Sequence, residues 1–372
     1  MTSIDLVSRI LEGFNPKKYN LRDDFQLTKF TAMKGCGCKV PQKALRDLLK
    51  SFGDSIGLDS CVVPLRHKGL NLVQTTDFFY PLVDDAYIMG RITLANVLSD
   101  LYAMGVSTCD NLLMLLGVSI ELTEHERDVV IGQFIQGFKD GADLAETKVR
   151  GGQTVRCPWL LLGGVASSVA TNEEIIKVDR ATPGDVLVLT KPIGGQIAVN
   201  TYEWLKNSDP RIGEFDLEPE RIIKAYQQAC EQMTRLNRNA ARLMHKYEAH
   251  ASTDVTGFGI LGHAQNLVQA QKNKVNFEFD HLPTIAYMEQ AARKMVAAGK
   301  PGFNFLKGTS AETSGGLLIA MSEENAKNFI QELEELDGHP AWIVGRVAEG
   351  SNQAFFRDSV EFIEVTSNIH VE

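Results

Sequence analysis

The sequence has no long apolar run: its most apolar stretches, 112–118 and 159–165, are far shorter than the roughly 18 residues of a membrane-spanning helix. Basic residues are not in excess, because 38 Lys and Arg against 47 Asp and Glu leave a net charge of −9. Cysteine is sparse, with six in 372 residues, and the N-terminal segment lacks the basic and apolar regions of a secretory signal. We therefore expect reduced thiols, a cytoplasmic location, and neither membrane nor nucleic acid among the partners.

Two glycine-rich nucleotide motifs are also absent, GxxxxGK[ST] and a GxGxxG between a strand and a helix. An ATP site in this chain must therefore use another scaffold. The turn expected at Gly151, Gly152, Gln153 and Thr154 is a candidate, since its backbone N–H groups can cradle phosphate or hold a nucleobase or ribose. Gly-Gly also forms ordinary turns, and that interpretation stays open.

The length predicts two domains, at roughly 150 residues each. A polar, glycine-containing segment over 1–44 is expected as a mobile arm, and a boundary near 175–182 divides the rest into domains 45–178 and 179–372. Both halves alternate strands with helices, which predicts two α+β or α/β domains. Strands are expected at 25–30, 70–79, 111–119, 159–169, 186–190, 275–279, 317–321 and 342–347, and helices at 4–14, 86–104, 124–144, 220–247, 285–298 and 323–336.

The segment 34–39 reads Lys-Gly-Cys-Gly-Cys-Lys and is the most unusual feature of the arm. The lysines favour the thiolate form of Cys36, and the glycines allow close approach to a ligand, with Lys39 near an anionic substrate. Two alternatives stay open: half of a metal site, although no other motif completes four ligands, or solvated thiols without a role. The four isolated cysteines, 61, 109, 157 and 230, are interpreted as small buried residues.

Four aspartates lie where a carboxylate is difficult to bury without a cation or another partner. Asp59 lies in a turn before the apolar segment 61–63, and Asp77 lies near the end of the strand expected at 70–79. Asp100 lies inside an apolar helix, and Asp254 lies in the segment 252–259, which contains two glycines. Together they fit a site for Mg²⁺ and ATP, because Mg²⁺ takes carboxylate and phosphate oxygens. Each one alone also fits a helix cap or an Asx turn, least of all Asp100 in mid-helix.

These residues fall in segments that resemble the selenophosphate synthetase (selenide, water dikinase) family over residues 25–350. The matching segments, in order, are KGCGCKVP (34–41), GLDSCVVPL (57–65), LVQTTDFFYPLVDD (72–85), ANVLSDLYAMG (95–105), GGQT (151–154), PGDVLVLTKPIG (183–194), TDVTGFGILGHA (253–264) and ETSGGLL (312–318). The resemblance implies a two-domain α+β fold like that of aminoimidazole ribonucleotide synthetase, with the N-terminal sheets forming a dimeric β-barrel. It also implies that ATP, selenide and water give selenophosphate, AMP and orthophosphate, with Mg²⁺ and K⁺.

Residue by residue, the resemblance makes Cys36 the catalytic cysteine and Lys39 the catalytic lysine, with Cys38 an auxiliary thiol at most. Contacts with ATP and its metal are implied at Lys39, Gly57, Leu58, Asp59, Asp77, Asp100, Gly151, Gly152, Gln153 and Thr154, and metal binding at Asp59, Asp77, Asp100 and Asp254. A homodimer and a selenium-delivery protein are the expected protein partners. Two alternatives remain, another ATP-dependent enzyme of the same superfamily and a non-catalytic nucleotide-binding paralogue, and Cys36 argues against both.

Overall fold

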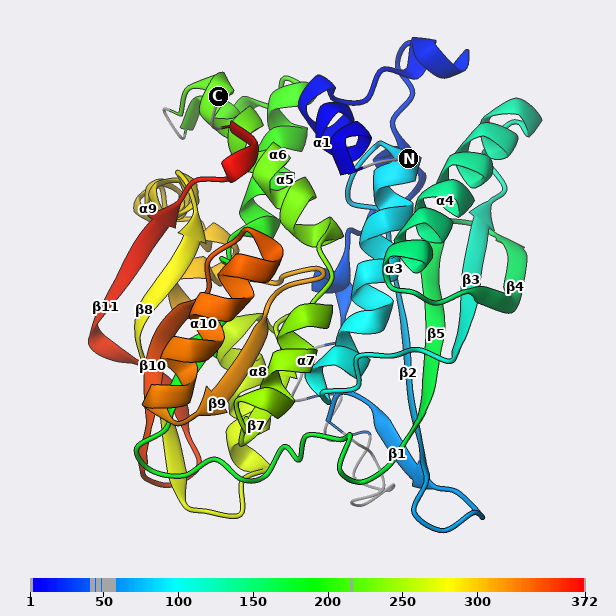
Figure 1. Ribbon diagram of the computed structural model, residues 1–372. Coiled ribbons are helices and arrows are strands. Elements are labelled where there is room, and N and C mark those ends of the chain that lie inside the picture. The colour runs from blue at the N-terminus through cyan, green and yellow to red at the C-terminus, as the bar shows by residue number, and fades with distance from the viewer. Residues whose placement is uncertain (1–2, 41–43, 45–47, 49–57, 215–216, 371–372) are drawn as a thin grey trace.

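The computed structural model describes residues 3–40, 44, 48, 58–214 and 217–370. Two mixed β-sheets flank a central helix, α3 (Ala86–Ala103), with strands β1–β5 on one side and β6–β11 on the other (Figure 1). Helices accompany both sheets, which confirms the expected two-domain α+β class. No closed barrel is present among the described strands. None of the described helices combines the length and the apolar character needed to cross a membrane.

The N-terminal sheet has the order β1-β2-β5-β3-β4, antiparallel except for the parallel pair β3 and β4. Its strands are β1 (Cys61–Pro64), β2 (Asn71–Phe79), β3 (Asn111–Ser119), β4 (Val149–Cys157) and β5 (Leu161–Ala170). Helix α4 (Glu124–Leu144) packs against α3 and begins at a capping box formed by Thr123 and Glu126.

The C-terminal sheet has the order β11-β8-β10-β6-β9-β7, antiparallel except for the parallel pair β11 and β8. Its strands are β6 (Val186–Leu189), β7 (Ala251–Asp254), β8 (Val275–Ile285), β9 (Leu317–Met321), β10 (Trp342–Glu349) and β11 (Ala354–Val365). The accompanying helices are α5 (Gly195–Lys206), α6 (Pro219–Thr234), α7 (Arg238–Lys246), α8 (Gly259–Gln269), α9 (Met288–Ala297) and α10 (Glu323–Asp337).

Helix α3 joins the two halves into one core. Every residue of α3 except Asp100 is buried, as expected for a helix that is apolar on all sides. It contacts β2, β5 and α4 in the N-terminal half and α6, α7 and β7 in the C-terminal half. Glycine allows its close packing on α4, because a Cβ at Gly137 would lie 2.0 Å from the Tyr87 carbonyl oxygen. A polar side chain on α3 can therefore contact residues of both domains.

The described part of the N-terminal arm packs onto this core. Helix α1 (Ser3–Glu12) contacts α6, and Arg9 Nε lies 2.6 Å from Asp85 Oδ2 at the start of α3. Phe25 and Leu27 are almost completely buried. The strand expected at 25–30 is wrong, because Leu27–Phe30 forms a turn of 3₁₀ helix whose Thr28 hydroxyl donates to Asp84 at 2.8 Å.

Other expected elements also need correction. The turn expected at 151–154 lies in strand β4, where Gly152 has a φ of +147° and a Cβ would lie 1.9 Å from the Met114 carbonyl oxygen. Gly152 therefore permits close strand pairing rather than a turn. The helix expected at 220–247 is two helices, because Asn237 donates to Ser99 Oγ and to the Gly315 carbonyl in the break between α6 and α7.

Two further differences concern strand ends and cysteines. Strand β8 continues to Ile285, so the helix expected at 285–298 begins only at Met288, and β11 was not expected. All six cysteines are free, as expected. Of the four isolated ones, only Cys230 is fully buried, whereas Cys61 is exposed.

Candidate active site

Four aspartates that are far apart in the sequence line one cleft of about 470 Å³, which we call the acidic cleft. Asp59 precedes β1, Asp77 lies on β2, Asp100 on α3, and Asp254 ends β7. Since β2 and β7 both contact α3, the fold brings carboxylates from both domains together. Lys39 of the N-terminal arm lines the same cleft.

Three of these carboxylates form a compact group, in which one oxygen each of Asp59, Asp100 and Asp254 lie within 4.8 Å of one another. Thr75 Oγ1 donates to Asp100 Oδ2 at 2.5 Å, and Thr253 Oγ1 donates to Asp59 Oδ1 at 2.8 Å. Asp59 Oδ2 and Asp254 Oδ2 are buried and have no hydrogen-bond partner among the described residues. Buried oxygens of this kind are unfavourable alone, so the group fits a divalent cation with oxygen ligands.

The electrostatics of the cleft agree with this chemistry. Burial, and then repulsion from neighbouring carboxylates, raises the pKa of Asp59 and Asp100 well above the usual range. Burial raises the pKa of Asp77 to about 6, and Lys39 opposes that rise. Burial lowers the pKa of Lys39, but Asp77 and the other nearby acidic groups outweigh it and hold the ammonium charged. The cleft therefore crowds carboxyl groups that bind protons more readily than usual around one charged ammonium, that of Lys39.

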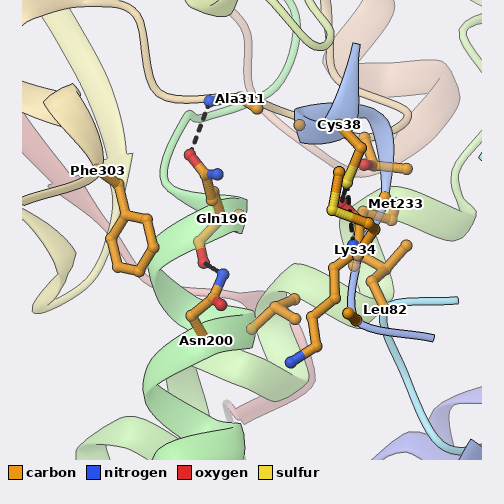
Figure 2. Close-up of a pocket in the computed structure, with 15 residues that line it drawn as sticks. Lys34, Cys38, Leu82, Gln196, Asn200, Met233, Phe303 and Ala311 are labelled. Atoms are coloured by element: carbon orange, nitrogen blue, oxygen red, sulfur yellow. Dashed lines mark hydrogen bonds between the residues drawn. The ribbon is translucent and has the colours of Figure 1, made fainter. Parts of the chain in front are cut away.

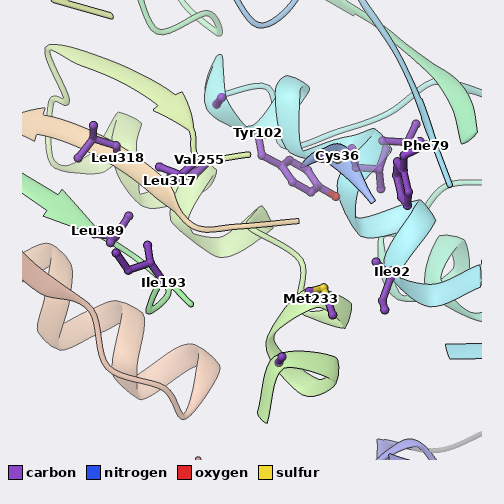
Figure 3. Close-up of a cluster of buried hydrophobic side chains, with 14 of the residues drawn as sticks. Cys36, Phe79, Ile92, Tyr102, Leu189, Ile193, Met233, Val255, Leu317 and Leu318 are labelled. Atoms are coloured by element: carbon purple, nitrogen blue, oxygen red, sulfur yellow. The ribbon is translucent and has the colours of Figure 1, made fainter. Parts of the chain in front are cut away.

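Cys36 begins a 3₁₀ turn, Cys36–Cys38, beside the acidic cleft. Its backbone N–H donates to Thr313 Oγ1 at 3.1 Å, and Gly257 supports the turn, because a Cβ there would lie 2.4 Å from the Cys36 carbonyl oxygen. Figure 3 includes Cys36 in the cluster of buried apolar side chains, and only 3% of it is exposed. Burial raises the pKa of the Cys36 thiol to about 12 despite Lys39, so the expected preference for thiolate is wrong in this packed state.

Asn96 on α3 connects the thiol with the carboxylates. Its Nδ2 donates to Asp77 Oδ2 at 2.9 Å, while its Oδ1 accepts from the Cys36 thiol at 3.6 Å and from the Ser314 backbone N–H at 2.7 Å. One fully buried amide therefore fixes the positions of a thiol, a cleft carboxylate and the loop before β9. The sequence offered a signal for it, since Asn96 is a polar residue inside an apolar helix.

Comparison with known proteins identifies the family. Residues 57–169 match the family model of the AIR synthase related protein, N-terminal domain, and residues 182–358 match that of the C-terminal domain. A "Probable selenide, water dikinase" of Caenorhabditis elegans is 62% identical, and the alignment covers 98% of this chain and 99% of that one. "Selenide, water dikinase 2" of Homo sapiens is 48% identical, with 95% and 87% covered. The chain belongs to the selenide, water dikinase family.

Solved structures support the fold of this selenide, water dikinase family member. A thiamine monophosphate kinase from Aquifex aeolicus has a TM-score of 0.61 at 19% identity, covering 87% of this chain and 99% of that chain. The hydrogenase maturation protein HypE in complex with ATP has a TM-score of 0.57 at 16% identity, covering 93% and 100%. At these identities the likeness concerns the fold alone.

The other residues for which the family resemblance implies nucleotide contact do not all line the acidic cleft. Leu58 lines the acidic cleft next to Asp59, whereas Gly57 lies outside the described residues. The segment 151–154 is exposed on β4 and is not part of the cleft lining in this single chain. The structure therefore gathers the cysteine turn, Lys39 and the four aspartates, but not the 151–154 segment.

Sequence reasoning missed His263 on α8, a titratable side chain of the cleft, and interpreted Cys61, which also lines the cleft, as a buried residue. Burial lowers its pKa to about 3, so the ring is neutral, and its Nε2 accepts from the Phe258 backbone N–H at 3.3 Å. The Lys39 ammonium lies 5.7 Å from the centre of the Phe258 ring. The neutral His263 ring therefore holds the backbone of Phe258, whose side chain contacts Lys39. Only the position of His263 in the matched segment 253–264 hinted at this.

Proposed function

We propose that this chain is a selenophosphate synthetase that converts ATP, selenide and water to selenophosphate, AMP and orthophosphate. The observation that carries the proposal is one juxtaposition: the Lys39 ammonium and four carboxylates line one cleft, and Asn96 connects the buried Cys36 thiol beside it to Asp77. Close relatives named selenide, water dikinase support the reaction. Phosphoryl transfer depends mainly on positioning and charge stabilisation, which this cleft is built to supply.

Asp59, Asp100 and Asp254 would hold Mg²⁺, with Asp77 as a fourth candidate ligand. The support is the grouping of their oxygens and the two buried oxygens without partners. When bound, Mg²⁺ supplies positive charge to the phosphate oxygens of ATP. K⁺ belongs to the proposal through the family resemblance alone.

Lys39 would contact the phosphates of ATP, because its ammonium stays charged among the aspartates. Cys36 would hold or deliver selenium, and Asn96 would keep its sulfur close to Asp77. Closure of the arm over the nucleotide would exclude bulk water from the first transfer. Water would then hydrolyse the remaining diphosphate. The packed Cys36 thiol is protonated. We therefore expect its activation to require either movement of the arm or a bound anion that accepts the thiol proton.

The N-terminal sheet supports the proposed homodimer. Phe78, Val63, Val155 and Val169 are exposed, and the strand register places them on the sheet face that α3 and α4 do not cover. An uncovered apolar sheet face is typical of an association surface. We propose that two chains pair these faces into a β-barrel, and that 151–154 contacts nucleotide across that interface. Phe78→Glu should shift the mass measured by light scattering from dimer to monomer, and an unchanged mass would contradict the interface.

The division into an arm (1–44) and domains 45–178 and 179–372 belongs to the same proposal, supported by family-model matches at 57–169 and 182–358. A cytoplasmic location fits six unpaired cysteines. A selenium-delivery protein belongs to the proposal through the family resemblance alone.

One assay tests the activity against its alternatives. The chain is incubated anaerobically with ATP, Mg²⁺ and hydroselenide, and the nucleotide products are separated. AMP that depends on selenide supports the synthetase, ADP supports a kinase of the same superfamily, and no turnover supports a non-catalytic paralogue. Phosphorus NMR of the same mixture detects the selenium–phosphorus bond directly.

A further inference from the structure

A second cavity borders the cysteine turn and shares no lining residue with the acidic cleft. We call it the side pocket; its volume is about 220 Å³. Figure 2 shows Lys34 and Cys38 on one side of it and Gln196 and Asn200 of α5 on the other. Gly35 and Gly37 also line it, so the turn that carries Cys36 separates two different cavities.

The two thiols of the turn differ in accessibility. Cys36 is 3% exposed, whereas Cys38 is partly exposed and lines the side pocket. The Cys38 sulfur accepts from the Lys34 backbone N–H at 3.0 Å and lies 3.1 Å from the Lys34 carbonyl oxygen. Burial raises the pKa of Cys38, and the Lys34 N–H and ammonium counteract that rise. A reagent too large for the core therefore meets Cys38 before Cys36.

Charge also separates the two cavities. Four aspartates line the acidic cleft and repel an anion, whereas Lys34 is the only charged residue in the described lining of the side pocket. The Lys34 ammonium pairs with Glu203, which leaves the pocket near neutral. A selenium anion or its thiol conjugate, which brings no metal ion, is therefore better tolerated in the side pocket, while ATP would occupy the cleft together with Mg²⁺.

The size of the side pocket indicates a thiol conjugate rather than a bare selenium atom. Its 220 Å³ corresponds to about seven water molecules at about 30 Å³ each. That space accommodates a cysteinyl group that carries selenium. Amide, thioether and aromatic groups of Gln196, Met233 and Phe303 line it, a mixture suited to a small thiol.

We propose that the side pocket binds thiol-bound selenium, R–S–SeH, and that Cys38 is its first acceptor; this rests on the proposed function. The Cys38 sulfur attacks selenium, a new S–Se bond forms, the donor's S–Se bond breaks, and the thiol proton passes to R–S to give R–SH. The same exchange moves the –SeH group from Cys38 to Cys36 and returns the proton to Cys38. No external oxidant or reductant is required in either step.

The test measures selenium loading without ATP, so it is independent of turnover. Glutathione selenopersulfide is added to the full chain with Cys36→Ser, and digestion with mass spectrometry locates the added selenium. We expect it on Cys38. Selenium distributed equally over Cys38, Cys61 and Cys109, or absent from Cys38, would overturn the proposal.

Kinetics give the second measurement. In an otherwise native chain, Cys38→Ser should slow the loading of Cys36 about 10-fold or more, because the positioned relay thiol is lost. Cys109→Ser, a partly buried thiol outside both cavities, is the matched control and should load at the native rate. Asn200→Trp, which fills the side pocket, should slow loading of Cys38 itself. Equal loading of Cys36 in native and Cys38→Ser chains would refute the relay.

A third arm identifies the source of the selenium. The same –SeH group is presented on glutathione and on the cysteine of a folded carrier protein. Loading of Cys38 by glutathione assigns a small-thiol donor, and loading by the carrier alone assigns a protein donor. Loading by neither contradicts the site. A chain that loads normally but makes no AMP from ATP and hydroselenide would instead contradict the proposed function.

Discussion

Asp100→Asn gives the sharpest test of the cation site, because it removes one charge from a crowded group and keeps its shape. Its oxygen lies within 4.8 Å of one oxygen each of Asp59 and Asp254. Two unit charges at 4.8 Å repel by about 3.5 kcal/mol at an effective dielectric constant near 20. Proton uptake relieves part of this repulsion, since the pKa of Asp100 is raised. We therefore expect the variant to gain about 1–3 kcal/mol of stability without divalent ions.

The pH dependence follows from the direction of the shifts. The folded pKa values of Asp59, Asp77 and Asp100 are raised, so the folded chain binds more protons than the unfolded one. Stability without metal should thus fall as pH rises from about 4 through the folded pKa values, which include about 6 for Asp77. Asp100→Asn should flatten this fall, and its advantage should be largest near pH 8.

The assay is thermal unfolding with a chelator and then with Mg²⁺. The variant should melt about 2–6 °C above the native chain in chelator at pH 8, and Mg²⁺ should raise its Tm less than it raises that of the native chain. Asp143→Asn on α4, an exposed partner of Lys139, is the matched control and should change Tm little. A lower Tm for Asp100→Asn in chelator, or an equal response to Mg²⁺, would refute the cation site.

Three further predictions concern the same region. Asp77→Ala should lower turnover at least about 10²-fold at saturating Mg²⁺, as expected for loss of one electrostatic stabiliser; near-native rates would contradict its role. Cys36→Ser should abolish selenide-dependent AMP formation while calorimetry still detects ATP binding, and unchanged turnover would exclude it as selenium carrier. Glu312→Ala should lower the free energy of unfolding by about 1–3 kcal/mol, because the Glu312 carboxylate accepts hydrogen bonds from the backbone N–H groups of Gly194 and Gly195 inside the core. Thermal unfolding measures the effect, and an unaltered Tm would contradict it.

Periodicity predicted the elements that a single pattern determines. The helices at 86–103 and 124–144 and the strands at 71–79 and 111–119 begin and end within a residue or so of expectation. The errors occur where tertiary contacts override the local pattern. Gly-Gly at 151–152 resembles a turn, but β3 pairs with Gly152 at a distance that only glycine permits. The break before Arg238 depends on hydrogen bonds from Asn237 to distant residues.

In the candidate site, too, local sequence predicted some features and only tertiary packing decided the others. Apolar surroundings marked Asp100 as unusual, and the motif 34–39 marked the cysteine turn. No sequence pattern predicted that Asn96 would contact both Cys36 and Asp77, because these residues meet only when the arm and β2 both pack on α3. The acidity of Cys36 was predicted wrongly for a related reason. Adjacent lysines favour the thiolate, but burial outweighs them once the turn is packed.

The sequence by itself determined the family, the α+β class, the types of reactive residue, and the aspartates whose burial requires a cation or another partner. These properties depend on residue identity and local order, which remain the same in an unfolded chain. Only the tertiary structure decided which carboxylates share a cation, which thiol is exposed, and that one turn separates two cavities. Those properties depend on distances between remote segments and on the exclusion of water, and both are created by packing around α3.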